Sequence, residues 1–232
     1  HLWMGDYITC NEQGHAVEFT ELAQQSGGSR EETGIARIGV LRGDVDNLGA
    51  AFIAGFSSSY DTLSRKVTLS RNLSLFFKQY IKAICQGHTA EGTPGFTLFT
   101  DEVKRERKVH VIYSGGDDMF LAGTWDDILE VAVDIRHAFR RFTNGKLTFS
   151  AGIGFFHPSC PISQMARETG KLEDYAKANP RHDKDSVALF GEVSQSTGKD
   201  SAMMTARYSW DEFEQGVCQD KLRFLERNMT LQ

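Results

Sequence analysis

A Gly-Gly-Asp-Asp sequence at residues 115–118 constrains the fold of this chain more than any other feature. It separates two short apolar segments, 109–113 and 119–122, that have the composition of β-strands. Glycine tolerates the backbone angles of a tight turn, so the pattern predicts a β-hairpin with Asp117 and Asp118 at its tip. Paired carboxylates on a rigid turn suit Mg²⁺, which takes oxygen ligands and shares them with nucleotide phosphates.

A second acidic pair follows another predicted strand, residues 35–41. Asp44 and Asp46 are two residues apart and would face the same side if the strand continues, whereas Val45 would face the core. If this strand neighbours the hairpin, all four acids converge. Such a cluster of like charges is costly unless metal ions neutralise it, as in two-metal phosphoryl-transfer sites. For Asp46 an alternative is a hydrogen bond to the backbone of its own loop.

Composition limits the class of protein. The 232 residues, 40% of them hydrophobic, suffice for one large domain or one domain with appendages. A net charge of −5 excludes a body built as a basic nucleic-acid clamp, although a local patch or a partner subunit could still bind nucleic acid. The four cysteines are scattered without a C-x-x-C pair, which predicts reduced packing residues. No apolar segment reaches the roughly 20 residues of a membrane span and no signal peptide is visible, so we expect a cytoplasmic protein without membrane contact.

Hydrophobic periodicity predicts the element order β-α-β-β-α-β-α-β. The first six elements match the ferredoxin-like split arrangement that polymerase palms also use, so we predict an α+β, ferredoxin-like palm. A helix from Ser209 onward would add a short C-terminal helical extension. The predicted elements span residues 35–41, 61–86, 109–113, 119–122, 124–142, 147–156, 161–178 and 186–190.

The same pattern divides the chain into three parts. Residues 1–33 are expected to be a linker or the tail of a preceding segment, 34–200 the palm, and 208–232 the start of a helical domain. Polar segments at 24–32 and 194–201 are typical of linkers. The charged segment 104–108 is expected to be a solvated loop, with a phosphate contact as the alternative.

Several short sequences in one order carry a resemblance to a known family. Residues 42–49 (Arg-Gly-Asp-Val-Asp-Asn-Leu-Gly), 113–118 (Tyr-Ser-Gly-Gly-Asp-Asp) and 150–154 (Ser-Ala-Gly-Ile-Gly) are followed by 161–168 and 184–190. In this combination the chain resembles the Gly-Gly-Asp-Asp palm domain of the large subunit of type III CRISPR interference complexes, most of all the III-A (Csm) branch. The GGDEF diguanylate cyclases are more distant, because their fifth motif position is Phe where this chain has Met119.

The resemblance implies an activity and partners. Such palms join ATP into cyclic oligoadenylates through 3′–5′ links when the complex binds target RNA, which implies ATP, two Mg²⁺ or Mn²⁺ ions, other Csm subunits, CRISPR RNA and target RNA as ligands and partners. The family's nuclease domain is not recognisable in this sequence, so DNA cleavage is not expected of it. Two alternatives stay open: a diguanylate cyclase-like enzyme, or a catalytically silent scaffold palm that binds subunits and RNA.

The resemblance also implies site residues. Asp44, Asp117 and Asp118 would be catalytic and would hold the metal ions together with the carbonyl of Val45. The residues implied to bind the nucleotide are Ser114, Gly115, Gly116, Asn47, Lys177 and Lys184. Each has a simpler alternative role. The two glycines could only form the turn, the serine hydroxyl could be structural, the asparagine amide could cap its loop, and the lysines could be solvated surface charges.

Overall fold

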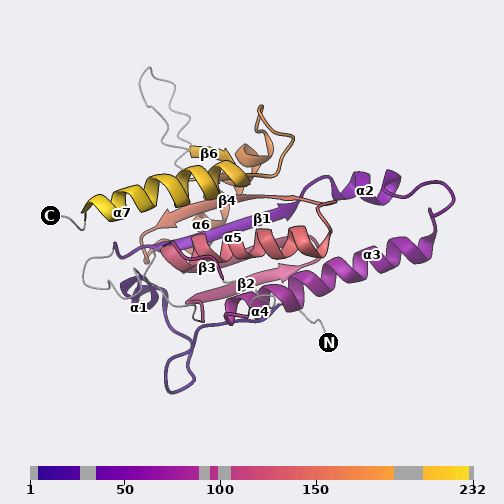
Figure 1. Ribbon diagram of the computed structural model, residues 1–232. Coiled ribbons are helices and arrows are strands. Elements are labelled where there is room, and N and C mark those ends of the chain that lie inside the picture. The colour runs from indigo at the N-terminus through magenta and orange to yellow at the C-terminus, as the bar shows by residue number, and fades with distance from the viewer. Residues whose placement is uncertain (1–4, 27–34, 89–94, 99–105, 191–205, 230–232) are drawn as a thin grey trace.

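A computed structural model describes residues 5–26, 35–88, 95–98, 106–190 and 206–229 of the chain (Figure 1). Across these residues one six-stranded sheet runs in the order β2-β3-β1-β4-β5-β6. Strand β1 is antiparallel to β3 and β4, and β4 is parallel to β5. The strands are β1 (Ile38–Val45), β2 (Val109–Gly115), β3 (Asp118–Thr124), β4 (Phe149–Phe156), β5 (Ser186–Leu189) and β6 (Ala206–Ser209).

The predicted α+β palm is confirmed, with helices on both faces of the sheet. One face carries α5 (Trp125–Phe142) and a long helix composed of α3 (Leu63–Leu75), η2 (Phe76–Tyr80) and α4 (Ile81–Cys85). Their apolar side chains form the largest core cluster with Leu41 and Val45 of β1. Val45 therefore faces the core as predicted, because alternate residues of a strand point to opposite faces.

Helix α6 (Ile162–Lys177) covers the opposite face of the sheet (Figure 1). It lies unusually close to β4 at Gly152, where an added Cβ would come within 2.5 Å of the Glu173 backbone nitrogen and 2.7 Å of the Leu172 Cβ. The absence of a side chain at Gly152 thus permits the contact. This contact fixes where the end of α6, with Glu173 and Lys177, lies relative to the strands.

The C-terminal helix begins as predicted after Ser209. The hydroxyl of Ser209 accepts from the Glu212 backbone nitrogen at 3.2 Å, and the Glu212 carboxylate accepts from the Ser209 nitrogen at 3.0 Å, which is a capping box. The helix continues through η3 (Glu212–Leu222) and α7 (Arg223–Met229). Trp210 is fully buried, and its indole nitrogen donates to the Phe149 carbonyl at 2.9 Å. The helix is therefore anchored in the palm at its first turn.

Three short elements have no counterpart in the sequence prediction: α1 (Phe19–Gln24), α2 (Leu48–Ala54) and β6. Each is too short to show a clear hydrophobic period. Residues 5–26 also pack along the edge of the sheet, where the Val111 nitrogen donates to the Tyr7 carbonyl at 2.8 Å. The polar segments predicted as linkers lie mostly or wholly outside the described residues.

Two smaller expectations need correction. The prediction of a solvated loop at 104–108 is wrong for Arg107, which is 2% exposed and forms ion pairs with Glu130 and Asp134 of α5. All four cysteines are free, and Cys85 and Cys218 are buried packing residues as expected, but Cys10 is exposed. Among the helices of the described residues, none is both long and apolar enough to cross a membrane.

Candidate active site

The register of the sheet brings the two acidic sequences together at one end. Asp44 on β1 lies directly opposite Asp118 on β3 and also pairs with Ser150 on β4. Directly opposed residues project from the same face of a sheet. The Val45 nitrogen donates to the Asp117 carbonyl at 3.0 Å, which ties the end of β1 to the hairpin turn. The end of the first strand and the Gly-Gly-Asp-Asp hairpin are therefore adjacent.

The hairpin turn leaves open space above its backbone. Gly116 has a φ of +71° and Asp117 does not have a positive φ, as expected for the two central residues of a type II′ turn. A Cβ added at Gly116 would meet no atom within 4 Å, and one added at Gly115 would meet only atoms at 3.8 Å or beyond. A ligand can thus approach the backbone of both glycines, although they also form the turn itself.

The acids at this site repel one another. Burial raises the pKa of Asp117, and the charges of Asp44 and Asp118 raise it further. The Lys177 ammonium offsets part of this charge, since its Nζ donates to Asp44 Oδ2 and to Glu173 Oε1, both at 2.6 Å. Burial lowers the pKa of Lys177, but the hydrogen bonds to Asp44 and Glu173 and the charges of these two acids together raise it by more. The site therefore holds more negative charge than its own side chains neutralise.

This charge and the chemistry of the donors fit a divalent cation. Carboxylate oxygens are the ligands that Mg²⁺ and Mn²⁺ prefer. Burial is the largest cause of the raised pKa of Asp117, and the charges of Asp44 and Asp118, which add to it, are ones that a cation would offset. Within the described part of the chain, no group of three or more histidine, cysteine or acidic residues is arranged as a metal site. In this arrangement Asp44 Oδ2 accepts a hydrogen bond from Lys177. The ligand roles of Asp44, Val45, Asp117 and Asp118 stay predictions.

Asp46 does not join this cluster, so the prediction that all four acids converge is wrong. Asp46 faces the same side of the sheet as Asp44, as predicted, because it contacts the side chain of Ser150, which lies directly opposite Asp44; its carboxylate is nevertheless directed toward β4 and not toward the hairpin. Asp46 is 3% exposed, and its Oδ2 accepts from Thr148 Oγ1 at 2.8 Å, Ser150 Oγ at 3.1 Å and the Asp185 nitrogen at 3.0 Å. Burial raises its pKa despite these hydrogen bonds. Asp46 thus joins β1, β4 and the turn before β5, not its own loop.

The predicted nucleotide-binding residues fall into two groups. Asn47 and Lys184 lie beside the end of β1, where the Lys184 Nζ donates to Asn47 Oδ1 at 2.6 Å. Lys177 contacts Asp44 from the end of α6. By contrast, Ser114 is fully buried and its hydroxyl donates to the Phe77 carbonyl at 2.5 Å. That contact favours the structural alternative for Ser114.

Two residues near the acids were not predicted as part of the site. Tyr113 has a pKa raised by burial and by its hydrogen bond with Asp118, and its hydroxyl donates to the Gly115 carbonyl at 3.2 Å. Glu173 is 5% exposed and bridges Lys177 to Arg42, whose Nε lies 2.9 Å from Glu173 Oε2. The i,i+4 spacing of Glu173 and Lys177 was a readable signal, since such pairs meet on a helix.

Comparison with known proteins identifies a family of similar sequences. The family model of the Cas10/Cmr2 second palm domain matches residues 37–188. A relative from Mycobacterium tuberculosis (strain ATCC 25618 / H37Rv), the single-strand-specific deoxyribonuclease Cas10/Csm1 of a subtype III-A CRISPR system, is 41% identical over 97% of this chain. The chain spans 24% of that relative's length.

Solved structures of similar proteins give the same result. A Csm1–Csm4 cassette in complex with cA4 matches with a TM-score of 0.72 and 34% identity, over 92% of this chain and 28% of that one. A cassette in complex with one ATP matches with a TM-score of 0.72 and 34% identity, over 92% and 27%. The resemblance found in the sequence is confirmed, and this chain belongs to the family of Cas10/Cmr2 second palm domains.

Proposed function

We propose that this palm is a nucleotidyltransferase that joins ATP into cyclic oligoadenylates as part of a type III-A CRISPR complex. One structural observation carries the proposal: Asp44 and Asp118 lie directly opposite each other, next to a glycine turn whose backbone is open. Similar Csm1–Csm4 cassettes bind cA4 and ATP, which supports an adenine nucleotide as substrate and a cyclic oligoadenylate as product.

The chain's own residues supply binding and charge. Lys177 and Lys184 would bind the triphosphate, and a phosphate arriving at Lys177 would replace Asp44 as its anionic partner. The open backbone at Gly115 and Gly116 would admit phosphate or ribose. Asp44, Asp117, Asp118 and the Val45 carbonyl would hold two Mg²⁺ or Mn²⁺ ions. When bound, these ions lower the pKa of the attacking 3′-hydroxyl and neutralise charge on the reacting phosphates.

The proposal extends to partners and location. Similar structures are Csm1–Csm4 assemblies, which supports Csm subunits as partners of this chain. CRISPR RNA and target RNA would act through the assembled complex, in the cytoplasm. The relatives are named as single-strand-specific deoxyribonucleases, but the chain spans only 24% of the Mycobacterium tuberculosis protein. We therefore do not assign DNA cleavage to this palm.

The test supplies ATP and Mn²⁺ to the complete complex with its target RNA. Replacing both hairpin acids (Asp117→Ala/Asp118→Ala) is expected to lower oligoadenylate yield by more than about 100-fold, because several kcal/mol of charge stabilisation are lost. The matched control is Asp174→Ala, an exposed acid on α6. Equal yields from wild type and the double variant would reject the proposal.

A parallel reaction with GTP separates the alternatives. A cyclic dinucleotide product from GTP would favour the diguanylate cyclase-like enzyme. No product from either nucleotide, together with retained assembly and RNA binding, would favour the silent scaffold. The proximity of the acids argues against the scaffold, since a binding palm has no need for carboxylates that repel one another.

A further inference from the structure

A strained turn carries Lys184 into the site. Lys184 and Asp185 have φ values of 64° and 45°, so two consecutive residues other than glycine are left-handed. Such backbone costs of order 1 kcal/mol or more for each residue and persists only where the surroundings enforce it. The contacts that enforce it therefore determine where the Lys184 ammonium lies.

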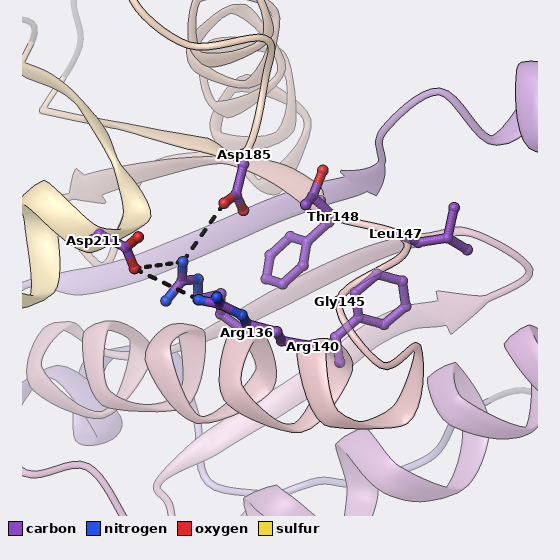
Figure 2. Close-up of a pocket in the computed structure, with 9 residues that line it drawn as sticks. Arg136, Arg140, Gly145, Leu147, Thr148, Asp185 and Asp211 are labelled. Carbon is purple, nitrogen blue, oxygen red and sulfur yellow. Dashed lines mark hydrogen bonds and ion pairs between the residues drawn. The ribbon is translucent and has the colours of Figure 1, made fainter.

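Asp185 is the point at which this turn is held. Its nitrogen donates to Asp46 Oδ2 at 3.0 Å, and its carbonyl accepts from the Trp210 nitrogen at 3.1 Å. Its carboxylate Oδ2 lies 3.6 Å from Arg136 NH2 (Figure 2). Asp185 thus contacts the end of β1, the C-terminal helix and α5 at once.

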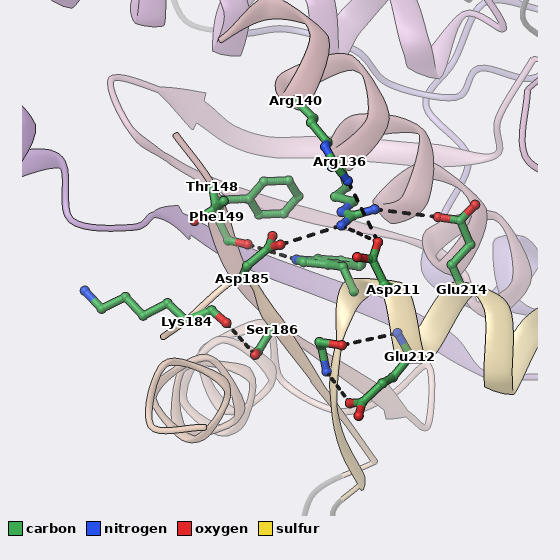
Figure 3. A network of polar contacts seen from close by, with 12 residues as sticks. Arg136, Arg140, Thr148, Phe149, Lys184, Asp185, Ser186, Asp211, Glu212 and Glu214 are labelled. Atoms are coloured by element: carbon green, nitrogen blue, oxygen red, sulfur yellow. Dashed lines mark hydrogen bonds and ion pairs between the residues drawn. The ribbon is translucent and has the colours of Figure 1, made fainter. Parts of the chain in front are cut away.

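Arg136 joins this turn to the C-terminal helix. It is 5% exposed, and the same NH2 that faces Asp185 donates to Asp211 Oδ1 at 2.7 Å, while NH1 lies 3.8 Å from Glu214 Oε2 (Figure 3). A buried guanidinium needs such partners, because an unpaired buried charge is costly. One nitrogen shared between Asp185 and Asp211 means that a shift of the C-terminal helix changes how Asp185 is held.

The packing around this group leaves it room to move. Arg136, Asp185 and Asp211 line a cavity of about 200 Å³ (Figure 2). A densely packed interior would resist a change in the Arg136 contacts, whereas a cavity beside them allows the guanidinium to redistribute between the two carboxylates.

We propose that Arg136 is a positioning residue that couples the C-terminal helix to triphosphate binding, by holding Asp185 and through it Lys184. The inference rests on the proposed function, in which Lys184 binds the triphosphate. It predicts that the position of the C-terminal helix regulates the affinity of the palm for ATP. The contacts run in sequence from Asp211 through Arg136 and Asp185 to Lys184.

The experiment measures oligoadenylate synthesis by the complete complex as a function of ATP concentration. Asp185→Asn keeps the side-chain size and suits a left-handed backbone, but removes the charge that Arg136 holds. We expect it to raise KM for ATP about threefold to tenfold with kcat changed less than about twofold, the pattern of lost substrate binding. The matched control is Asp183→Asn, an exposed acid two residues earlier, which should leave KM unchanged.

A double variant distinguishes positioning from general damage. If Asp185 acts through Lys184, then Asp185→Asn should add little to the rise in KM caused by Lys184→Ala, because coupled residues are not additive. Asp211→Asn, at a side chain that is 61% exposed, removes the competitor of Asp185 for Arg136, so it should lower KM, and it serves where Asp185→Asn fails to fold. Additive effects of Asp185→Asn and Lys184→Ala, or an Asp211→Asn complex whose KM equals or exceeds that of wild type, would overturn the inference.

The outcome is separable from that of the proposed function. If the complex loses synthesis on replacement of Asp117 and Asp118 but Asp185→Asn behaves like Asp183→Asn, the function stands and the coupling fails. If synthesis survives the loss of both hairpin acids, the function fails whatever the KM values are.

Discussion

Replacing Gly152 with alanine tests whether the contact between β4 and α6 determines where Lys177 lies. The new Cβ would come within 2.5 Å of the Glu173 nitrogen and 2.7 Å of the Leu172 Cβ. The first is a helix backbone atom, which cannot yield unless α6 moves. Overpacking of this kind costs about 1–3 kcal/mol. For a chain of this size each kcal/mol lowers Tm by about 2–4 °C, so Tm should fall by about 2–12 °C.

The matched control lies on the same strand and face. At Gly154 an added Cβ would meet chiefly the ring of Phe156, a half-buried side chain that can rotate away. Gly154→Ala should therefore cost less than about 1 kcal/mol. Thermal unfolding of the full chain, followed by circular dichroism, compares the two variants. The packing argument would be refuted if the Gly152→Ala chain had the Tm of wild type. It would also be refuted if the Gly154→Ala chain had a lower Tm than the Gly152→Ala chain.

The consequence for the site follows from the same movement. Displacing α6 from β4 would separate Lys177 from Asp44, which now lie 2.6 Å apart. In the complete complex, Gly152→Ala should therefore raise KM for ATP more than Gly154→Ala does. Equal KM values in the two variants would show that Lys177 does not depend on this contact.

Two further predictions concern charge. Burial and the neighbouring acids raise the pKa of Asp117, so its ionised form is disfavoured in the folded chain. Asp117→Asn should therefore stabilise the metal-free chain at pH 7 by roughly 0.2–1 kcal/mol, a small gain because solvent screens the site. That gain should vanish as pH falls toward about 4, where the carboxyl of the unfolded chain is also protonated, and a gain in thermal unfolding that does not depend on pH would contradict a raised pKa of Asp117. Arg107→Ala should cost about 3–5 kcal/mol in denaturant unfolding, because it leaves Glu130 and Asp134 buried without their cation. Arg140→Ala, at a side chain that is 63% exposed, should cost less than about 1 kcal/mol, and similar losses for the two arginines would contradict the burial argument.

The parts of the fold that follow local rules were predictable from the sequence. The hairpin at 115–118 follows from glycine between two apolar segments, and α6 begins and ends within a residue of the predicted 161–178. The adjacency of Asp44 and Asp118 was predicted only on condition that the two strands are neighbours. The register of β1 against β3 supplies that condition.

The predictions that failed depend on contacts distant in sequence. Asp46 was assigned to the acid cluster because it faces the same side as Asp44, but its carboxylate binds Thr148, Ser150 and the Asp185 nitrogen, which lie more than 100 residues away in sequence. Arg107 belongs to a charged segment that suggests solvent, and its acidic partners are 23 and 27 residues away. The part played by Arg136 was not visible either, because Asp185 and Asp211 approach it from elements that only the folded sheet brings together.

The central claim is that the acid at the end of β1 and the acids of the hairpin hold the same divalent ions. Its most direct test is a titration of the complete complex with Mn²⁺ in the presence of a non-hydrolysable ATP analogue, followed by electron paramagnetic resonance. Asp44→Ala and Asp117→Ala/Asp118→Ala should each lose the tight Mn²⁺ sites of wild type, whereas Asp174→Ala should keep them. Undiminished Mn²⁺ binding in either of the first two would contradict a shared site.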